Sequence, residues 1–329
     1  MKQKRFAGMA NRAFRTVAAC AVGMMLAGIC SCGGKASAQG GSTASAVGAQ
    51  KAETKAEKKA GAMSIDELKK LPPSPESDFL VKPTDDSFTA VMVTEYKGND
   101  QVVVIPATIQ GLPVKWIGSN GPHTDGDGLF EDKTNLVAVV IPESATCIMQ
   151  YSFSGCKNLS SVVLPSTLKM IGHAAFCDCS KLTSIELPAG LPCINAFAFA
   201  RTGLTSVKLP EGLVAIGASA FRGTPLTSVS LPKSLRLMGS DPDGSFTGCD
   251  SLADIQIPAD HAISLDKRYI CEYEETFEQF FSGTKITESI ILQKQLKETK
   301  TRKMSDAKRD SLLGDIKKQV GDGFSWAGW

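Results

Sequence analysis

Two successive segments decide the fold of this chain: LSSVVLPSTLKMIGHAAFCDCSK, which starts at Leu159, and LTSIELPAGLPCINAFAFARTG, which starts at Leu182. Both have leucine at position 1, an alternating strand pattern over positions 3 to 6, proline at position 7, isoleucine at position 13 and phenylalanine at position 18. The pattern recurs at intervals of 23, 23, 22, 22 and 26 residues from Leu136 to Leu159, Leu182, Leu204, Leu226 and Leu252. Repetition this regular predicts stacked copies of one structural unit.

A unit of this size is too small to bury its own apolar positions, so successive copies must share one continuous core. The alternating segment predicts a short strand, and proline at position 7 ends it because proline has no backbone N–H to donate. The fold class we expect is a β-rich solenoid, a curved stack of short parallel strands. We expect the position-18 side chains to form a stacked structural spine: Phe153, Phe176, Phe199, Phe221 and Phe246.

Both flanks of the repeats suggest caps. On the N-terminal side, a predicted hairpin pairs Phe88–Tyr96 with Val102–Ile105 across the turn Lys97–Asp100. An irregular seventh unit is visible there as Val103–Pro106, Ile117-Gly118 and Leu129-Phe130. After Pro258 the repeat stops and aromatic residues gather, as expected of a segment that closes the open end of a core. Residues 290–320 then predict one or two helices.

The repeat L-x-x-I-x-L-P-x-x-L-x-x-I-G-x-x-A-F resembles the BspA-like class of bacterial leucine-rich repeats over about residues 88–258. The segment from Tyr96 to Gly118 is similar to the usual opening of that class. The resemblance implies a leucine-rich-repeat solenoid displayed on the cell surface, and members that adhere to host extracellular-matrix proteins such as fibronectin or fibrinogen, or to other cells. It implies no catalysis, and it carries over no ligand contacts because no motif fixes them.

The first 32 residues predict an export signal. Five basic residues within positions 1–15 precede the apolar stretch Thr16–Ile29, which is too short for a permanent membrane span. The end of this stretch resembles the lipobox of bacterial lipoproteins, in which a cysteine becomes lipidated. Cys32, preceded by Ser31, fits that pattern best, and Cys30 and Cys20 fit less well. A plain cleavable signal with incidental cysteines is the alternative.

The resulting domain organisation has five parts. They are a lipoprotein-type signal peptide at 1–32, a flexible Ala/Gly/Ser/Lys linker at 33–63, an N-terminal cap with the first irregular repeat at 64–135, the leucine-rich repeats at 136–258, and a C-terminal cap with a helical tail at 259–329. The linker has almost nothing to bury, so it supplies reach from an anchor.

Composition argues against several functions. The chain has 36 basic and 34 acidic residues, and because five basic ones lie in the export segment the remainder is slightly acidic, which argues against nucleic-acid binding. Only three histidines occur, and none has a nearby serine or cysteine in a nucleophile motif. We therefore expect no enzyme activity, no catalytic residues and no cofactor. The basic helical tail is interpreted as a solvated face rather than as a contact with an anionic surface.

A candidate binding face follows from strand geometry, because positions 3 and 5 point away from the core when positions 4 and 6 point into it. The residues proposed for this face are Val140, Val163, Ser184, Glu186, Ser206, Lys208, Ser228 and Ser230. Val140 and Val163 form an exposed apolar end in this interpretation. The face lacks the Trp, Tyr and Arg anchors of tight protein interfaces, so an alternative is that it only keeps the sheet soluble.

Cysteines and acidic turns offer only weak metal sites. Cys156, Cys179 and Cys249 share one repeat position and are interpreted as small core residues. Cys147 and Cys193 lie two repeats apart, beyond disulfide reach at a strand spacing of about 4.8 Å. Two insertions carry Asp-x-Asp-Gly, which makes weak calcium candidates of Asp125, Asp127, Asp241 and Asp243, although turns commonly contain these residues and no EF-hand glutamate follows.

Two functions remain in view. The first is a monomeric, non-enzymatic module for adhesion, lipid-anchored at the bacterial outer membrane or cell surface, that binds a protein or glycan ligand through its sheet face. The second is an envelope-structural or scaffold lipoprotein that faces the periplasm and acts through its C-terminal helices.

Overall fold

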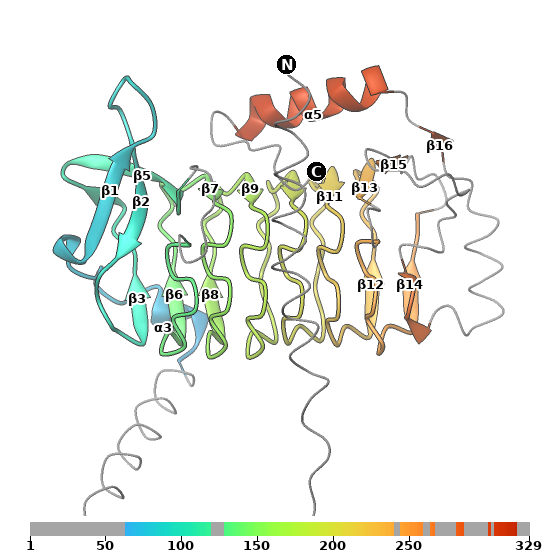
Figure 1. Cartoon of the computed structure of the whole chain (residues 1–329), viewed down its shortest axis with the longest axis horizontal. Coiled ribbons are helices and arrows are strands. Elements are labelled where there is room, and N and C mark those ends of the chain that lie inside the picture. Colours follow the sequence, from blue (N-terminus) through green and yellow to red (C-terminus); the bar gives the residue numbers. More distant parts are fainter. Residues whose placement is uncertain are drawn as a thin grey trace, which may run out of the picture. The chain divides into compact units, whose positions relative to one another are not determined.

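Each repeat forms one coil of a β-solenoid, and parallel strands join neighbouring coils (Figure 1). The computed structural model describes residues 63–119, 128–239, 244–258, 264–266, 281–285, 302–303 and 306–320. These residues lie in the second of two units, Gln50–Trp329, into which the chain divides after Ala49. The solenoid of parallel strands predicted from the periodicity is therefore confirmed.

The strands predicted at positions 3 to 6 form two short parallel sheets. One contains β3 (Val102–Val104), β6 (Ala138–Val140) and β8 (Ser161–Val163), and the other contains β12 (Ser228–Ser230) and β14 (Asp254–Gln256). Between them, residues 184–186 and 206–208 are not strands, and neighbouring coils are joined there by longer bonds such as Thr205 N–H to Thr183 O at 3.3 Å. The predicted ladder is thus interrupted in its middle.

A second strand in each coil, which the sequence did not predict, forms the longer sheet. Its order is β1-β2-β5-β7-β9-β10-β11-β13-β15-β16, with β4 (Thr108–Ile109) paired to β5. The strands from successive coils are β5 (Leu112–Ile117), β7 (Cys147–Ile148), β9 (Met170–Ile171), β10 (Cys193–Ile194), β11 (Ala215–Ile216), β13 (Leu237–Gly239), β15 (Ser264–Asp266) and β16 (Arg302–Lys303). Position 13 points inward from this sheet, and position 12 points outward.

The phenylalanine spine is present and continues beyond the five predicted residues. Consecutive rings from Phe130 to Phe281 have centroids 5.1 to 5.5 Å apart and nearly parallel planes, tilted by 2 to 13°. Tyr96 and Phe79 continue the contact at the N-terminal end. The backbone follows the same spacing in the five coils from Phe130 to Phe221, where each spine N–H donates to the next coil, as Phe176 does to Ala198 O at 2.8 Å. The described spine residues are Phe79, Tyr96, Phe130, Phe153, Phe176, Phe199, Phe221, Phe246 and Phe281.

The N-terminal hairpin exists, but the predicted pairing is wrong. β2 (Val91–Tyr96) pairs antiparallel with β1 (Phe79–Pro83), which follows the short helices α3 (Ile65–Leu68) and η1 (Glu76–Asp78). The expected partner, β3, instead joins β6 in parallel. Parallel pairing with the next coil extends the core, which a local hairpin would not do. At the edge of the long sheet, β1 carries a bulge between Leu80 and Val81 and ends in exposed Lys82 and Pro83.

The solenoid also continues past Pro258, where a cap was expected to begin. β15 pairs in parallel with β13, β16 pairs in parallel with β15, and Phe281 stacks on Phe246. The sixth unit is therefore completed after a long insertion. Tyr269, Tyr273, Phe277 and Phe280 lie outside the described residues. The C-terminal helix α5 spans Asp306–Val320, within the predicted helical region.

Truncation of a central ring tests the spine. Because Phe199 is fully buried between two stacked neighbours, Phe199→Ala should lower the free energy of unfolding by about 3 to 5 kcal/mol, measured by urea denaturation. Phe88→Ala, at a ring that is 65% exposed, is the control and should change it by less than about 0.5 kcal/mol. Equal effects of the two substitutions would contradict the role of the spine.

Candidate functional site

Six of the eight residues predicted for the binding face are exposed and lie in one part of the solenoid. We call them the serine face: Ser184, Glu186, Ser206, Lys208, Ser228 and Ser230. Asp254 and Gln256 continue it, because β12 and β14 are in register at Ser228↔Asp254 and Ser230↔Gln256. Glu186 and Lys208 form no ion pair within the described part of the chain. The serine face is therefore a polar surface of short side chains and two independent charges.

The predicted apolar end of this face is wrong, because α3 covers it. Val163 is only 6% exposed and Val140 is half-buried. Both pack in one cluster with Leu68 of α3, which is fully buried. The other members of that cluster are Met63, Ile65, Leu71, Val102 and Ala138. Figure 1 shows α3 beside β6 and β8. Residues 63–71 of the chain itself thus occupy the valine end.

Local sequence explains why α3 forms at this place. Ser64 and Glu67 make a capping box, with Glu67 N–H donating to Ser64 Oγ at 3.3 Å and Ser64 N–H donating to Glu67 Oε2 at 2.8 Å. The backbone hydrogen bond from Ser64 holds the pKa of Glu67 below its ordinary value. After the two prolines that follow α3, the backbone N–H of Ser74 donates to Val104 O at 2.8 Å. This bond joins the segment after α3 to β3.

The outer side of the long sheet carries a second surface that the sequence analysis missed. Position 12 is apolar in each coil from β7 to β13, and these residues are buried beneath α5. Leu313, Ile316 and Val320 of α5 pack on them, and Figure 1 shows α5 along the row of β7, β9, β11 and β13. We call the covered surface the apolar stripe: Trp116, Cys147, Met149, Met170, Cys193, Ala215 and Leu237. The sequence did contain a signal for this surface, because position 12 is apolar in every copy of the repeat.

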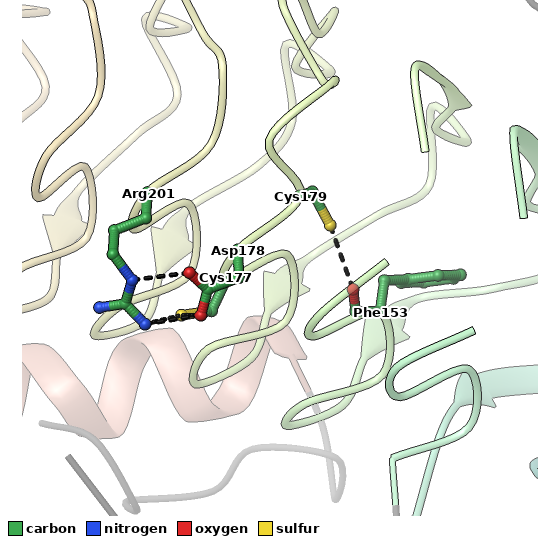
Figure 2. A network of polar contacts seen from close by, with 5 residues as sticks. All are labelled: Phe153, Cys177, Asp178, Cys179 and Arg201. Carbon is green, nitrogen blue, oxygen red and sulfur yellow. Dashed lines mark hydrogen bonds and ion pairs between the residues drawn. The ribbon is translucent and has the colours of Figure 1, made fainter. Parts of the chain in front are cut away.

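Cys177 and Cys179, which are separated by one residue, point to different environments (Figure 2). Cys179 Sγ lies 3.1 Å from Phe153 O in the core, whereas Cys177 Sγ lies 3.3 Å from Arg201 Nη2. Arg201 also forms an ion pair with Asp178 at 2.6 Å. Burial opposes ionisation of Asp178, but the hydrogen bond and charge of Arg201 outweigh it and lower the pKa of that carboxyl. The thiols of Cys177 and Cys179 therefore do not point toward a common ligand.

The six cysteines in the described residues are all buried. Burial raises the pKa of Cys147 and of Cys156 to about 12. Cys156, Cys179 and Cys249 lie behind the spine, and each thiol is within 3.1 Å of a spine carbonyl. The neutral thiols thus act as core residues and weak hydrogen-bond donors.

Several predicted residues lie outside the described part of the chain: Cys32, Asp125, Asp127, Asp241 and Asp243. Among the residues that are described, no cluster of three or more His, Cys, Asp or Glu side chains could hold a metal ion. No helix in those ranges has both the length and the apolar character needed to span a membrane.

Comparison with known proteins agrees with this geometry. Residues 125–253 match the family model for the BspA type leucine rich repeat region in six copies. The crystal structure of the leucine rich repeat protein of T. pallidum is 26% identical, with a TM-score of 0.57, and the match covers 71% of this chain and 98% of that one.

Weaker matches include a leucine-rich repeat protein from Bacteroides ovatus, at 24% identity, TM-score 0.44 and coverage of 57% of this chain and 54% of that one. A leucine rich cell surface protein from Faecalibacterium prausnitzii is 25% identical, with a TM-score of 0.41 and coverage of 56% and 54%. No curated protein matches the sequence. Residues 125–253 are thus similar to the BspA type of repeat, and the solenoid architecture is similar to that of the T. pallidum leucine rich repeat protein.

A buried charge tests the contact between α3 and the valine end. Val163→Glu should expel α3, because a carboxylate there would be buried against Leu68 without a partner. Hydrogen exchange by mass spectrometry should then show loss of protection at residues 65–71, while exchange at 170–240 stays unchanged. Val163→Ile is the control that keeps the surface apolar. Protection that survives Val163→Glu would show that α3 is held by other contacts.

Proposed function

We propose that this chain is a lipid-anchored, non-enzymatic binding module of the bacterial cell surface, and that it holds a protein or glycan ligand on the serine face. The exposed serine face is the observation that carries the proposal. BspA-type repeats are typically found in surface or adhesion-related proteins. Host extracellular-matrix proteins are the ligand class that the sequence resemblance favours.

Two apolar surfaces of the solenoid are covered by its own helices, and this supports the assignment. α3 occupies the valine end of the first-strand sheets, and α5 occupies the outer side of the long sheet. The serine face remains open and presents hydroxyl groups at the intervals set by the coils. Such a surface suits hydrogen bonding to an extended peptide or to a sugar chain, which also repeat donors and acceptors along their length. The absence of aromatic anchors among its six residues favours an avid or extended contact over a compact one.

The anchor and linker complete the proposal. Lipidation at Cys32 would hold the chain at the outer membrane, and the linker at 33–63 would give it reach. The first described helix begins at Ile65, two residues after the proposed end of the linker. The envelope-scaffold alternative relies on the C-terminal helices, and the apolar side chains of α5 are already in contact with the solenoid.

Binding measured by biolayer interferometry tests the serine face. Residues 33–329 are presented to fibronectin, fibrinogen and purified envelope glycans. Ser184→Arg/Ser206→Arg/Ser228→Arg should abolish saturable binding, because three long cations would obstruct an otherwise smooth surface. The matched control places arginine at three exposed positions elsewhere, Ser180, Ala189 and Asp250, and should bind as the parent does. Loss in both variants, or in neither, would reject the serine face.

Protease added to whole cells tests the location. A surface module should be released by trypsin from its lysine-containing linker, leaving the solenoid in the supernatant. A scaffold that faces the periplasm should stay intact until the outer membrane is permeabilised. Immunoblotting of cells and supernatant distinguishes the two, with a periplasmic marker protein to verify that the membrane is closed.

A further inference from the structure

The apolar stripe has the composition of a protein-binding surface. It contains one tryptophan, two methionines and two cysteines, and Met92 lies half-buried beside it. Tryptophan is enriched among the residues that dominate binding energy, and methionine adapts its shape to different apolar partners. The serine face has none of these residue types. The surface best suited to compact protein recognition is therefore the one that α5 covers.

The solenoid does not depend on α5 for its own hydrogen bonds. The strands beneath it pair with one another in register, as at Cys193↔Met170 and Cys193↔Ala215. Leu313, Ile316 and Val320 are held by apolar contacts, and the Cys147 thiol lies 4.0 Å from Val320 O. Gly314 weakens the helix, and a Cβ placed there would meet no atom within 4 Å. No steric requirement therefore explains a glycine at this position.

The stripe also has the dimensions of a helix site. A helix of 15 residues such as α5 is about 22 Å long at 1.5 Å per residue. The five strands from β7 to β13 span four intervals, or about 19 Å at the usual strand spacing. Branched apolar side chains at i, i+3 and i+7 of α5 contact this row. The stripe thus fits a helix of about the length of α5, with apolar side chains at i, i+3 and i+7.

We propose that the apolar stripe is a docking surface for an amphipathic helix of a partner protein, with branched apolar residues at i, i+3 and i+7, and that α5 occupies it as an internal competitor. A second copy of this chain is the less suitable occupant. Its α5 would have to displace an identical helix that is tethered at high effective concentration. A partner helix without the glycine forms a more stable helix than α5 does, and a second α5 lacks this advantage. This inference does not rest on the serine face or on the lipid anchor.

Site-resolved thiol labelling tests whether α5 can leave the stripe. Leu313→Asp/Ile316→Asp should undock α5 and make Cys147 and Cys193 react with a maleimide about tenfold faster or more, mapped by mass spectrometry. Cys156, Cys179 and Cys249 lie in the core and serve as internal references that should not change. Labelling of Cys147 and Cys193 that stays as slow as in the parent would overturn the proposal.

A peptide tests whether the vacated stripe binds a helix. The probe is a fluorescent peptide of residues 306–320 with Gly314 replaced by alanine, and its binding to the full chain is followed by fluorescence anisotropy. Binding should be about fivefold weaker to the Gly314→Ala protein, since ~1 kcal/mol of added helix stability strengthens the internal competitor by that factor. A peptide with aspartate at positions 313 and 316 is the control and should not bind.

A disulfide lock completes the test and remains informative if the aspartate variant fails to fold. Val320→Cys places a second thiol beside Cys147, and oxidation with copper–phenanthroline should join them and abolish peptide binding until a reductant is added. Equal binding to the locked and reduced proteins, or no binding to any form, refutes the proposal. Concentration-dependent dimerisation of the parent chain, lost on locking and measured by light scattering, would instead assign the stripe to a second copy.

Discussion

Burial between coils, with the position-18 ring at its centre, is the constraint on which the rest of this structure depends. No coil encloses its own core, so each one is stable only between two neighbours. The stacked rings keep one spacing from Phe130 to Phe281, and both sets of strands and the turn hydrogen bonds follow it. The first coil then needs a partner that is not a repeat, which Tyr96 and Phe79 of the β1–β2 hairpin supply.

The same repetition creates apolar outer surfaces that have to be covered. A side chain that is apolar at one repeat position becomes a continuous row when the coils stack, and water would face that row unless another segment covered it. α3 and α5 cover two such rows with the chain's own flanking residues. The surface that stays open is the one whose repeat positions carry serine, glutamate and lysine. Burial by flanking segments and solubility are thus divided among repeat positions rather than among domains.

The periodicity was sufficient to predict the solenoid, the spine and the outward direction of Ser184 or Lys208, because these depend on spacing alone. Position 12 was missed as a strand since two residues, such as Cys147-Ile148, are too few to show alternation. The pairing of Val102–Val104 was misassigned because sequence proximity favours a hairpin, whereas burial favours the next coil. The prediction that Val163 is exposed was wrong because the residue that covers it, Leu68, lies 95 residues earlier in the sequence. No periodicity connects the two.

The bulged edge strand β1 has a consequence for assembly. A stack of parallel coils has no intrinsic length, and an open end with unpaired strands is a template for another molecule. At the N-terminal end of this chain, the last strand runs antiparallel to its neighbour, is kinked between Leu80 and Val81, and ends in Lys82 and Pro83, which cannot continue a ladder readily. The β1 edge is therefore a poor template for pairing with a strand of another molecule.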